Sequence, residues 1–506
     1  MVPVRSPKAE LSLSLSTLSN YVHGNHTENQ MADSKESSSD TPSKLDTKID
    51  LATNLLDRRG RTIVLVAAFL GWMFAGWEMS ILPLSARSVT IGLLQDAPES
   101  AAWVADGLEE LAADSAAPGG PGDRLNKTVG KWFARYIAAF LFGAAAGGWI
   151  FGWFGDRAGR VKAMSISIIW YAAFTGLSYF VSTPLQMCVM RFIACMGIGG
   201  MWPTGVALVS EAWPDVSRPT LAGLIGTSAN VGIALLSIVV KQIGQFSSAH
   251  ELTPDSWRWM MLLGAVPAVL GVIFLFIVPE SPRWLAGIKS ASNRSPLVEV
   301  LRPPMVKYTL AGIALGTIPL LGAWGAQKWI LPWAGQVGAQ IGLESLKADT
   351  QTAWAIGAAI GSLCGGWLAT LLGRRTTYFA VSLGSLILAQ FIFQTLTPAP
   401  TWQFFVPVFT LGLVATVYFG WLPLFLPEMF PTRVRATGSG VAFNSGRIIA
   451  AVVVLSIAGL VEAMFNSDYP RIGSITSWVY VAGMVVILLV PKSTESIEEL
   501  DKADST

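Results

Sequence analysis

Long apolar runs recur from Ile63 to Val490 and constrain the fold more than any other feature of the chain. Each run is about 20 residues long, which is enough for a helix to cross a hydrocarbon core about 30 Å thick. Of the 506 residues, 52% are hydrophobic and only 13% are charged. A soluble domain could not bury that much apolar surface. The sequence therefore predicts an all-α membrane protein.

The apolar runs divide into twelve predicted transmembrane helices. They cover residues 61–86, 132–154, 163–182, 185–209, 219–242, 257–278, 304–332, 350–371, 376–396, 402–426, 437–461 and 473–490. Residues 1–58 differ, because serine, threonine, aspartate and lysine dominate from Ser34 to Asp50 without an apolar period. We expect a disordered tail there, with translation starting at Met1 or at Met31. The tail contains no secretory signal, so the first span is expected to direct membrane insertion.

The charges of the loops predict the orientation of the chain. Loops after every second span carry arginine and lysine, whereas the long loop 87–131 is rich in aspartate and glutamate. By the positive-inside rule, both termini are cytoplasmic and loop 87–131 faces outward. Helical periodicity from Trp103 to Leu111 predicts a short surface helix in that loop. The expected segments are a cytoplasmic tail 1–58, a six-helix bundle 59–284, a cytoplasmic linker 285–303, a six-helix bundle 304–491 and a cytoplasmic tail 492–506.

The two halves of the chain share residues at a nearly constant offset. The matching pairs are Gly143 and Gly357, Gly147 and Gly361, Gly152 and Gly366, Gly159 and Gly373, and Arg160 and Arg374 at an offset of 214, and Glu211 and Glu428, and Arg218 and Arg435 at an offset of 217. Small residues let membrane helices pack closely, which explains some of the glycines but not the arginines. Internal repeats of six helices are a known architecture of secondary transporters, with the substrate site at the repeat interface.

A cluster of charge interrupts the apolar runs at Gly152-Trp-Phe-Gly-Asp156-Arg157-Ala-Gly159-Arg160. It resembles the loop motif Gly-x-x-x-Asp-Arg/Lys-x-Gly-Arg-Arg/Lys of the major facilitator superfamily. The resemblance implies twelve transmembrane helices in two pseudo-symmetric six-helix bundles, and a cytoplasmic latch that holds the bundles together in the outward-facing state. We expect the glycines to permit a tight turn. We expect Asp156 to accept hydrogen bonds from the amides at a neighbouring helix N-terminus.

Two further charged clusters, Pro279–Trp284 and Pro427–Gly438, resemble the sugar porters and the related proton symporters of aromatic acids, sialic acid and other organic acids. Acids and bases at this spacing can form a cytoplasmic network, in which exposed pairs contribute only about 0–1 kcal/mol each. They suit switching better than stabilising, and simple topology signals are the alternative. The predicted latch residues are Gly152, Asp156, Arg157, Gly159, Arg160, Glu211, Arg218, Glu280, Arg283, Gly366, Gly373, Arg374, Arg375, Glu428, Arg433 and Arg435.

Two ionisable residues inside the spans, Glu78 and Arg191, are predicted to couple transport to protons. A charge at the centre of a membrane helix costs about 2.5–3.5 kcal/mol, so each one needs a functional explanation. The resemblance implies an acid in the first span and an arginine in the fourth, although Glu78 replaces the usual aspartate. Movement of the arginine relative to the carboxylate can make the site take up or release a proton. A purely structural ion pair is the alternative.

Polar and aromatic residues inside the spans are the candidates for substrate binding. The glutamine pair that sugar porters carry in the seventh span is missing, which weakens a hexose assignment. Lys328 and Arg447 could offer positive charge to a carboxylate. Lys328 could instead lie at the membrane boundary and snorkel. The predicted substrate-binding residues are Trp202, Asn230, Gln327, Lys328, Asn444 and Arg447.

These observations predict proton-coupled symport of a small polar metabolite, an organic anion or a sugar-like acid, by alternating access. The alternatives are an uncoupled facilitator, a proton antiporter that exports its substrate and a nutrient sensor that does not transport. The sequence shows no catalytic arrangement, cofactor fingerprint or metal cluster, and a net charge of +2 suggests no nucleic-acid partner. We expect a multi-pass monomer in a plasma or bacterial inner membrane, whose partners are a small-molecule substrate, protons and lipid.

The second copy of the motif has Thr370 at the position of Asp156, so the latch is predicted to be weaker in the second half. Replacing the acid with Asp156→Asn should lower the initial rate of substrate uptake into proteoliposomes far more than Thr370→Val does. Equal losses in the two variants would mean that the cluster serves membrane topology alone.

Overall fold

A computed structural model describes residues 56–113, 119–213, 216–249, 256–287, 296–430, 434–465 and 468–490. The predicted tails 1–58 and 492–506 lie outside the described residues, apart from residues 56–58, and so do residues 288–295 of the predicted linker. Within the described ranges the chain forms helices and no strand, and twelve helical segments are long and apolar enough to cross a membrane. The predicted all-α fold with twelve spans is confirmed.

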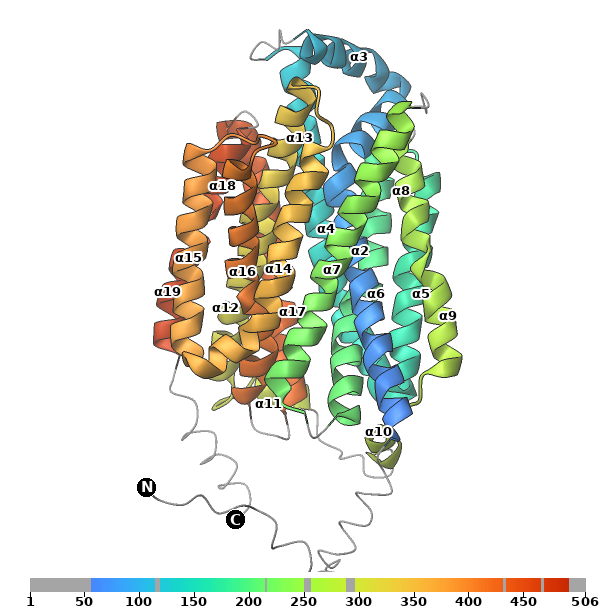
Figure 1. The fold of residues 1–506 in the computed structure, drawn as a ribbon, viewed down its shortest axis with the longest axis vertical. Coiled ribbons are helices and arrows are strands. Elements are labelled where there is room, and N and C mark those ends of the chain that lie inside the picture. Colours follow the sequence, from blue (N-terminus) through green and yellow to red (C-terminus); the bar gives the residue numbers. More distant parts are fainter. Residues whose placement is uncertain are drawn as a thin grey trace, which may run out of the picture. The chain divides into compact units, whose positions relative to one another are not determined.

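The first six spans lie between residues 58 and 277 (Figure 1). The sixth span is divided, because Pro267 lacks a backbone N–H and starts a new helix. The segments of these spans are α2 (Arg58–Gln95), α4 (Pro121–Ala158), α5 (Arg160–Leu177) with the 3-10 turn η1 (Ser178–Phe180), α6 (Pro184–Ala212), α7 (Arg218–Ala249), α8 (Ser256–Ala265) and α9 (Pro267–Ile277). Two helices lie outside the spans: α3 (Pro98–Ala112) and α10 (Pro282–Gly287).

The last six spans lie between residues 306 and 489, and the short α11 (Pro296–Val300) precedes them. The seventh span is irregular in its middle, where a π-helical turn and a 3-10 turn interrupt the α-helix. Such π-helical turns are frequent at functional sites. The segments are α12 (Val306–Leu320), η2 (Leu321–Ala326), η3 (Gln327–Trp329), α13 (Ile330–Gln340), α14 (Leu346–Leu371), α15 (Arg374–Thr395), α16 (Trp402–Glu428), α17 (Arg435–Phe465), α18 (Tyr469–Thr476) and α19 (Val479–Leu489).

The region between the first two spans is more helical than predicted. α2 continues to Gln95 and α4 begins at Pro121, so helix covers much of the predicted loop 87–131. The helix extends because its apolar face continues, with Val89 and Leu93 fully buried. α3 lies where the sequence predicts a short helix.

Close helix pairs occupy equivalent places in the two halves. α4 packs against α6, and a Cβ added to Gly147 would lie 1.8 Å from the carbonyl oxygen of Met196. α14 packs against α16, and a Cβ added to Gly361 would lie 1.9 Å from the carbonyl oxygen of Leu413. Only glycine lets two helix backbones approach so closely. Matching glycines therefore produce matching contacts, as the internal repeat predicts.

The turns after these helices also match. Gly159 joins α4 to α5 with a φ of 115°, and Gly373 joins α14 to α15 with a φ of 85°. Residues with a side chain rarely adopt a positive φ, because Cβ clashes with the backbone there. The tight glycine turn that the motif predicts is confirmed in both halves.

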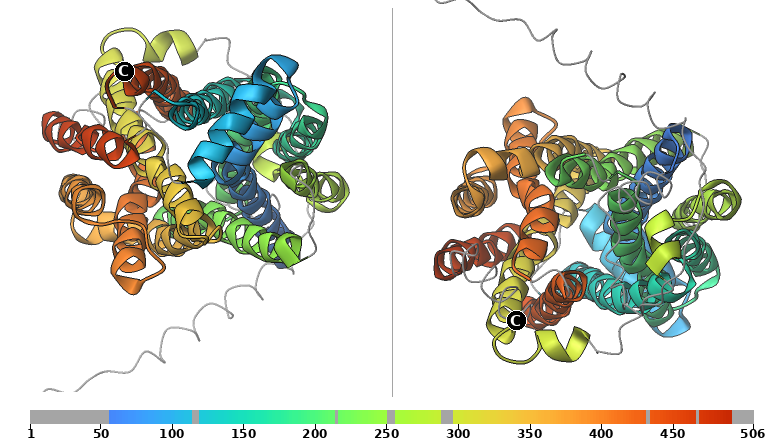
Figure 2. Two further views of the ribbon diagram at one scale, coloured as in Figure 1. Left: turned by 90° about the horizontal axis from the view of Figure 1, so that it is seen from above. Right: turned by 90° about the horizontal axis from the view of Figure 1, so that it is seen from below.

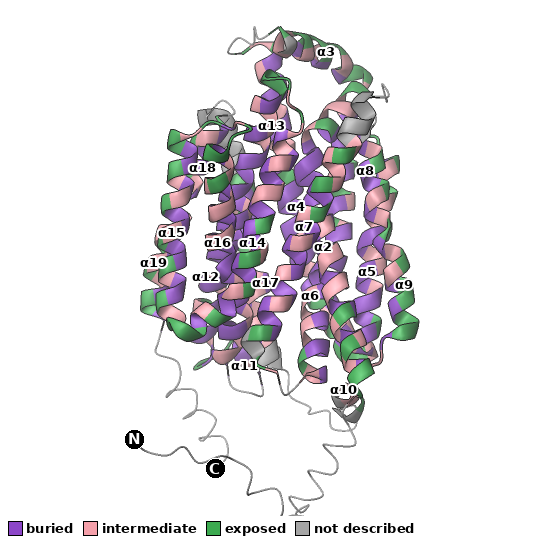
Figure 3. Cartoon of the chain, viewed as in Figure 1, coloured by how far each residue is buried: buried purple, intermediate pink, exposed green. Residues whose placement is uncertain are grey.

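The two sets of six spans lie side by side, as the end-on views show (Figure 2). They meet mainly along two helix pairs, α7 with α14 and α4 with α17. Buried residues concentrate on the helices between the two sets, while exposed residues lie along peripheral helices such as α9 and α19 (Figure 3). Large apolar side chains are exposed on these two helices, with Phe276 83% and Leu489 76% exposed. Such a surface suits contact with lipid.

Gly147 offers a direct test of this packing. Gly147→Ala should lower the apparent melting temperature of the purified protein, because its methyl group would overlap the backbone of α6, and overpacking typically costs about 1–3 kcal/mol. The matched control is Gly152→Ala on the same helix, where an added Cβ meets nothing within 4 Å. Equal melting temperatures for the two variants, measured in one detergent, would contradict the packing role of Gly147.

Candidate functional site

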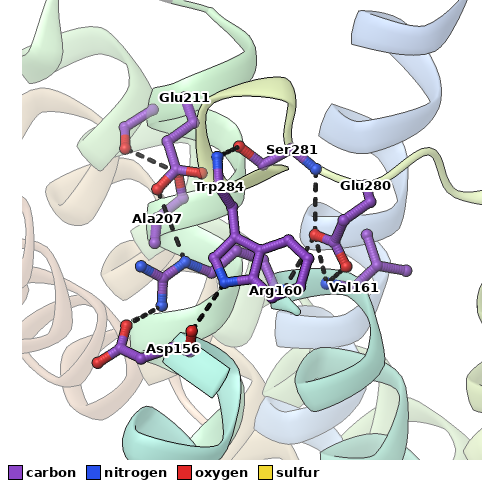
Figure 4. A network of polar contacts seen from close by, with 9 residues as sticks. Asp156, Arg160, Val161, Ala207, Glu211, Glu280, Ser281 and Trp284 are labelled. Atoms are coloured by element: carbon purple, nitrogen blue, oxygen red, sulfur yellow. Dashed lines mark hydrogen bonds and ion pairs between the residues drawn. The ribbon is translucent and has the colours of Figure 1, made fainter. Parts of the chain in front are cut away.

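The charged motif forms a polar network at the end of the spans that carries α10 (Figure 4). Glu280 accepts hydrogen bonds from the backbone N–H groups of Arg160 at 3.0 Å and Val161 at 3.2 Å, which begin α5. Unpaired amides and the helix dipole favour a carboxylate at this position. The prediction that Asp156 binds such amides is therefore wrong. The connection after α9 passes the start of α5 and places Glu280 there instead.

Asp156 binds an arginine side chain. Its Oδ1 accepts a hydrogen bond from Nη1 of Arg160, which lies beyond the Gly159 turn at the start of α5, and its carboxylate is largely exposed. Nε of Arg160 lies 3.6 Å from Oε1 of Glu211 at the end of α6. The indole N–H of Trp284 donates to the carbonyl oxygen of Asp156 at 2.8 Å. The motif therefore connects α4, α5, α6 and α10.

The second half repeats this network in reduced form. Arg374 donates two hydrogen bonds to the carboxylate of Glu428 at the end of α16, at 3.1 and 3.2 Å. Nη1 of Arg374 also donates to the hydroxyl of Thr370 at 3.2 Å, so a neutral hydroxyl takes the place of the acid. Arg375 donates to the carbonyl oxygen of Val490. The Arg374–Glu428 distance of 3.1 Å is shorter than the 3.6 Å between Arg160 and Glu211, so a weaker latch in the second half remains a prediction.

Both networks stay within one half, as far as the described residues show. The latch between the halves therefore remains a prediction.

Arg157 lies over the ring of Trp153, 4.6 Å from its centre. Gly366 of α14 packs against Gly420 of α16. A Cβ added to Gly420 would lie 3.1 Å from the backbone nitrogen of Gly366. Four predicted latch residues have side chains outside the described part of the chain: Arg218, Arg283, Arg433 and Arg435.

Glu78 of α2 is fully buried inside the first half. Its Oε2 accepts a hydrogen bond from the hydroxyl of Thr175 on α5 at 2.7 Å. Its Oε1 has no hydrogen-bond partner among the described residues. Gly264 of α8 leaves room for this oxygen, because a Cβ there would lie 2.8 Å from it. The carboxylate thus keeps one oxygen without a described partner where α2, α5 and α8 pack together.

Arg191 of α6 reaches the same place but does not bind the carboxylate. Its Nη2 donates to the backbone carbonyl oxygen of Glu78 at 3.0 Å. Its guanidinium lies 5.8 Å from the ring centre of Phe140. In the described structure no N–O distance within 4 Å joins the two charged groups, so they are neighbours without the direct ion pair of the alternative interpretation. Their role in proton coupling remains a prediction.

Two predicted substrate residues reach from one half to the other. Asn230 of α7 donates to the hydroxyl of Ser362 on α14 at 2.9 Å. Arg447 of α17 donates to the backbone carbonyl oxygen of Ala144 on α4 at 3.2 Å, and to the side-chain oxygen of Asn444 at 3.1 Å. Polar side chains that bind across the boundary can be released when the two halves move apart.

Lys328 lies in the irregular middle of the seventh span and is only 5% exposed. Its Nζ lies 4.5 Å from the ring centre of Trp354 and 5.2 Å from that of Trp324. It has no hydrogen bond or ion pair among the described residues, and its burial argues against snorkelling at the membrane boundary. Gln327 is fully engaged, because its amide donates to the hydroxyl of Tyr480 at 2.5 Å and accepts from Trp354 at 2.8 Å.

Trp202 of α6 packs within the first half. Its ring centre lies 4.9 Å from that of Trp72 on α2. This contact gives Trp202 a packing role, and its predicted role in substrate binding remains a prediction. The described contacts do not connect it with Lys328 or Arg447.

The sequence pattern of the Major Facilitator Superfamily matches residues 125–454. The chain belongs to this superfamily. It is similar to the cis,cis-muconate transport protein of Acinetobacter baylyi, with 26% identity over 333 residues, 63% of this chain and 76% of the relative. It is also similar to a sialic acid transporter of Escherichia coli, with 26% identity over 372 residues, 70% of this chain and 84% of the relative.

A solved D-xylose–proton symporter shares the fold, with a TM-score of 0.61 at 17% identity over 86% of this chain and 98% of that one. Together with the family match and the twelve candidate spans, this makes the protein a multi-pass membrane transporter and not an enzyme.

In this major facilitator protein, two polar contacts cross the boundary between the halves at the end that carries α3. Lys241 of α7 forms an ion pair with Asp349 of α14 at 2.7 Å. Lys347 of α14 donates to the backbone carbonyl oxygen of Leu84 on α2 at 2.5 Å. Both contacts must break before the two halves can separate at this end.

Sequence reasoning missed two polar residues of this major facilitator protein, Thr175 and Gln351. Gln351 lies on α14 and is fully buried. A signal for it was present, since Thr350-Gln351-Thr352 is a polar run within an apolar span. Thr175 gives no such signal, because threonine is ordinary in a membrane helix and only the fold places it beside Glu78.

Proposed function

We propose that this transporter moves a small organic anion together with a proton, by alternating access between its two halves. The observation that carries the proposal is Lys328, a buried cation without an acidic partner among the described residues. A cation at the centre of a membrane helix costs about 2.5–3.5 kcal/mol. A carboxylate on the substrate would supply the missing opposite charge.

Arg447 offers a second positive charge, at the boundary between the halves. It is 6% exposed, and both of its described hydrogen bonds come from Nη1. A guanidinium has five N–H donors, so the remaining nitrogens can bind further acceptors on a substrate. Two buried cations on the second half suit an anion better than a neutral sugar.

The relatives support the same class of substrate. One is named for cis,cis-muconate and another for sialic acid. Both compounds are carboxylic acids, and they share little else in size or shape. The common feature that two buried cations can recognise is the carboxylate.

Glu78 is the proposed proton carrier. Its Oε1 is free among the described residues, and Arg191 binds the neighbouring carbonyl oxygen. A rearrangement that moves the guanidinium toward or away from the carboxylate would change how tightly the site binds a proton. One proton moving down 100 mV supplies about 2.3 kcal/mol, which corresponds to a gradient of about fifty-fold.

The contacts at the boundary support the proposal of alternating access. Ion pairing and hydrogen bonding close the end that carries α3, and the transport cycle requires a second state in which these contacts are broken. We propose that this end faces outward and that both termini are cytoplasmic, as the loop charges indicate.

Glu78→Gln separates coupling from transport. Gln keeps the size and a hydrogen-bond acceptor for Thr175 but cannot carry a proton. In proteoliposomes the variant should exchange radiolabelled cis,cis-muconate or sialic acid across the membrane, yet fail to accumulate either one under a pH gradient. Initial exchange rates and steady-state accumulation are the two measurements.

The matched control is Glu344→Gln, which neutralises an exposed acid between α13 and α14. It should accumulate substrate like the unaltered protein. Undiminished accumulation by Glu78→Gln would exclude Glu78 as the proton carrier. Export driven by the pH gradient would favour the antiporter, and equilibration without accumulation by the unaltered protein would favour the facilitator.

A further inference from the structure

A small cavity lies between the irregular middle of the seventh span and the first turns of α14. The cavity is partly open, and all the residues that line it belong to the second half, including one from α16. Its lining combines one cation, two amides and one hydroxyl with apolar walls. The residues are Gln327, Lys328, Ile330, Leu331, Thr350, Gln351, Trp354 and Val408.

Gln351 is the unexplained member of this lining. It is fully buried, and neither its amide nitrogen nor its amide oxygen has a hydrogen-bond partner among the described residues. The neighbouring polar groups are satisfied: Thr350 donates to the carbonyl oxygen of Leu346 at 2.6 Å, and both amide atoms of Gln327 are bonded. Buried amides are almost always paired, so an orphan in a cavity indicates a missing partner.

Lys328 faces the same cavity with an unpaired charge. The rings of Trp324 and Trp354 stabilise its ammonium by cation–π contact, but they provide no hydrogen-bond acceptor. A water molecule could satisfy the amide of Gln351, but it would leave the charge of Lys328 uncompensated. A carboxylate would satisfy both groups, because it can accept hydrogen bonds from the ammonium of Lys328 and from the amide N–H of Gln351. The amide oxygen can then accept another hydrogen of the ammonium.

We propose that this cavity binds one carboxylate group of the transported anion, between the ammonium of Lys328 and the side-chain amide of Gln351. The cavity is small, so it takes the carboxylate and leaves the rest of the substrate outside. The site rests on the function proposed above, and it adds Gln351 and Trp354 to the residues that recognise the substrate.

The face of α14 extends this site toward the end that carries α3. Lys347, Gln351 and Trp354 are spaced four and three residues apart, which places them on one side of the helix. Lys347 lies about 6 Å along the helix from Gln351. Its ammonium is bound to Leu84 of the other half while that end is closed. Opening would release it to meet the entering anion first.

Two substitutions of Gln351 test the site by binding, without transport. The purified full chain in detergent is titrated calorimetrically with acetate, benzoate, cis,cis-muconate and sialic acid. Gln351→Leu should weaken binding of the preferred acid at least about tenfold, because it removes a hydrogen bond to a charged group. Gln351→Glu should abolish binding and raise the melting temperature without ligand, since its carboxylate would occupy the site and pair with Lys328.

The matched control is Gln390→Leu on α15, which replaces another amide on a membrane helix, one that is bonded to Ser477 at 2.7 Å. It should bind the acid like the unaltered protein. Unchanged binding by both Gln351 variants would mean that the cavity holds water only, and the organic-anion function would still stand. Failure of the unaltered protein to bind any of the four acids would contradict both the site and that function.

Discussion

A charged side chain surrounded by hydrocarbon loses the water that stabilises it, and this constraint decides how the buried charges of this transporter are arranged. Arg191 and Arg447 bind backbone carbonyl oxygens, and Glu78 binds a threonine hydroxyl. Lys328 rests on two tryptophan rings. Each charge is only partly satisfied by described neighbours. The hydrogen bonds and opposite charges that these groups still lack can be supplied by a proton and a substrate anion.

The packing of the helices keeps each half rigid while the boundary stays breakable. Inside each half, glycines bring helix backbones into direct contact, as Gly147 and Gly361 do. Close backbone contacts of this kind favour helices that move together. Between the halves, Gly223 of α7 also lies against the backbone of Leu363 on α14, but the polar contacts come from single side chains such as Asn230, Lys241 and Lys347. The division suits two rigid bodies that move against each other.

The sequence predicts the fold well, because apolar length, glycine spacing and the repeat are local or periodic patterns. It also identifies Glu78, Arg191, Lys328 and Arg447 as candidate functional residues, since any charge in an apolar run is conspicuous. It fails where the partner is set by three-dimensional proximity. Glu280 rather than Asp156 binds the start of α5, and Thr175 and Gln351 acquire their roles from neighbours on other helices.

If a proton and an organic anion cross in one cycle, entry of the anion must carry protons across the membrane. Proteoliposomes containing the unaltered protein and a pH-sensitive dye start with equal pH on both sides. External cis,cis-muconate or sialic acid, whichever acid the protein binds, should acidify the interior as it enters down its own gradient, more than in protein-free liposomes. Entry of the labelled acid without any change in internal pH would exclude proton-coupled symport.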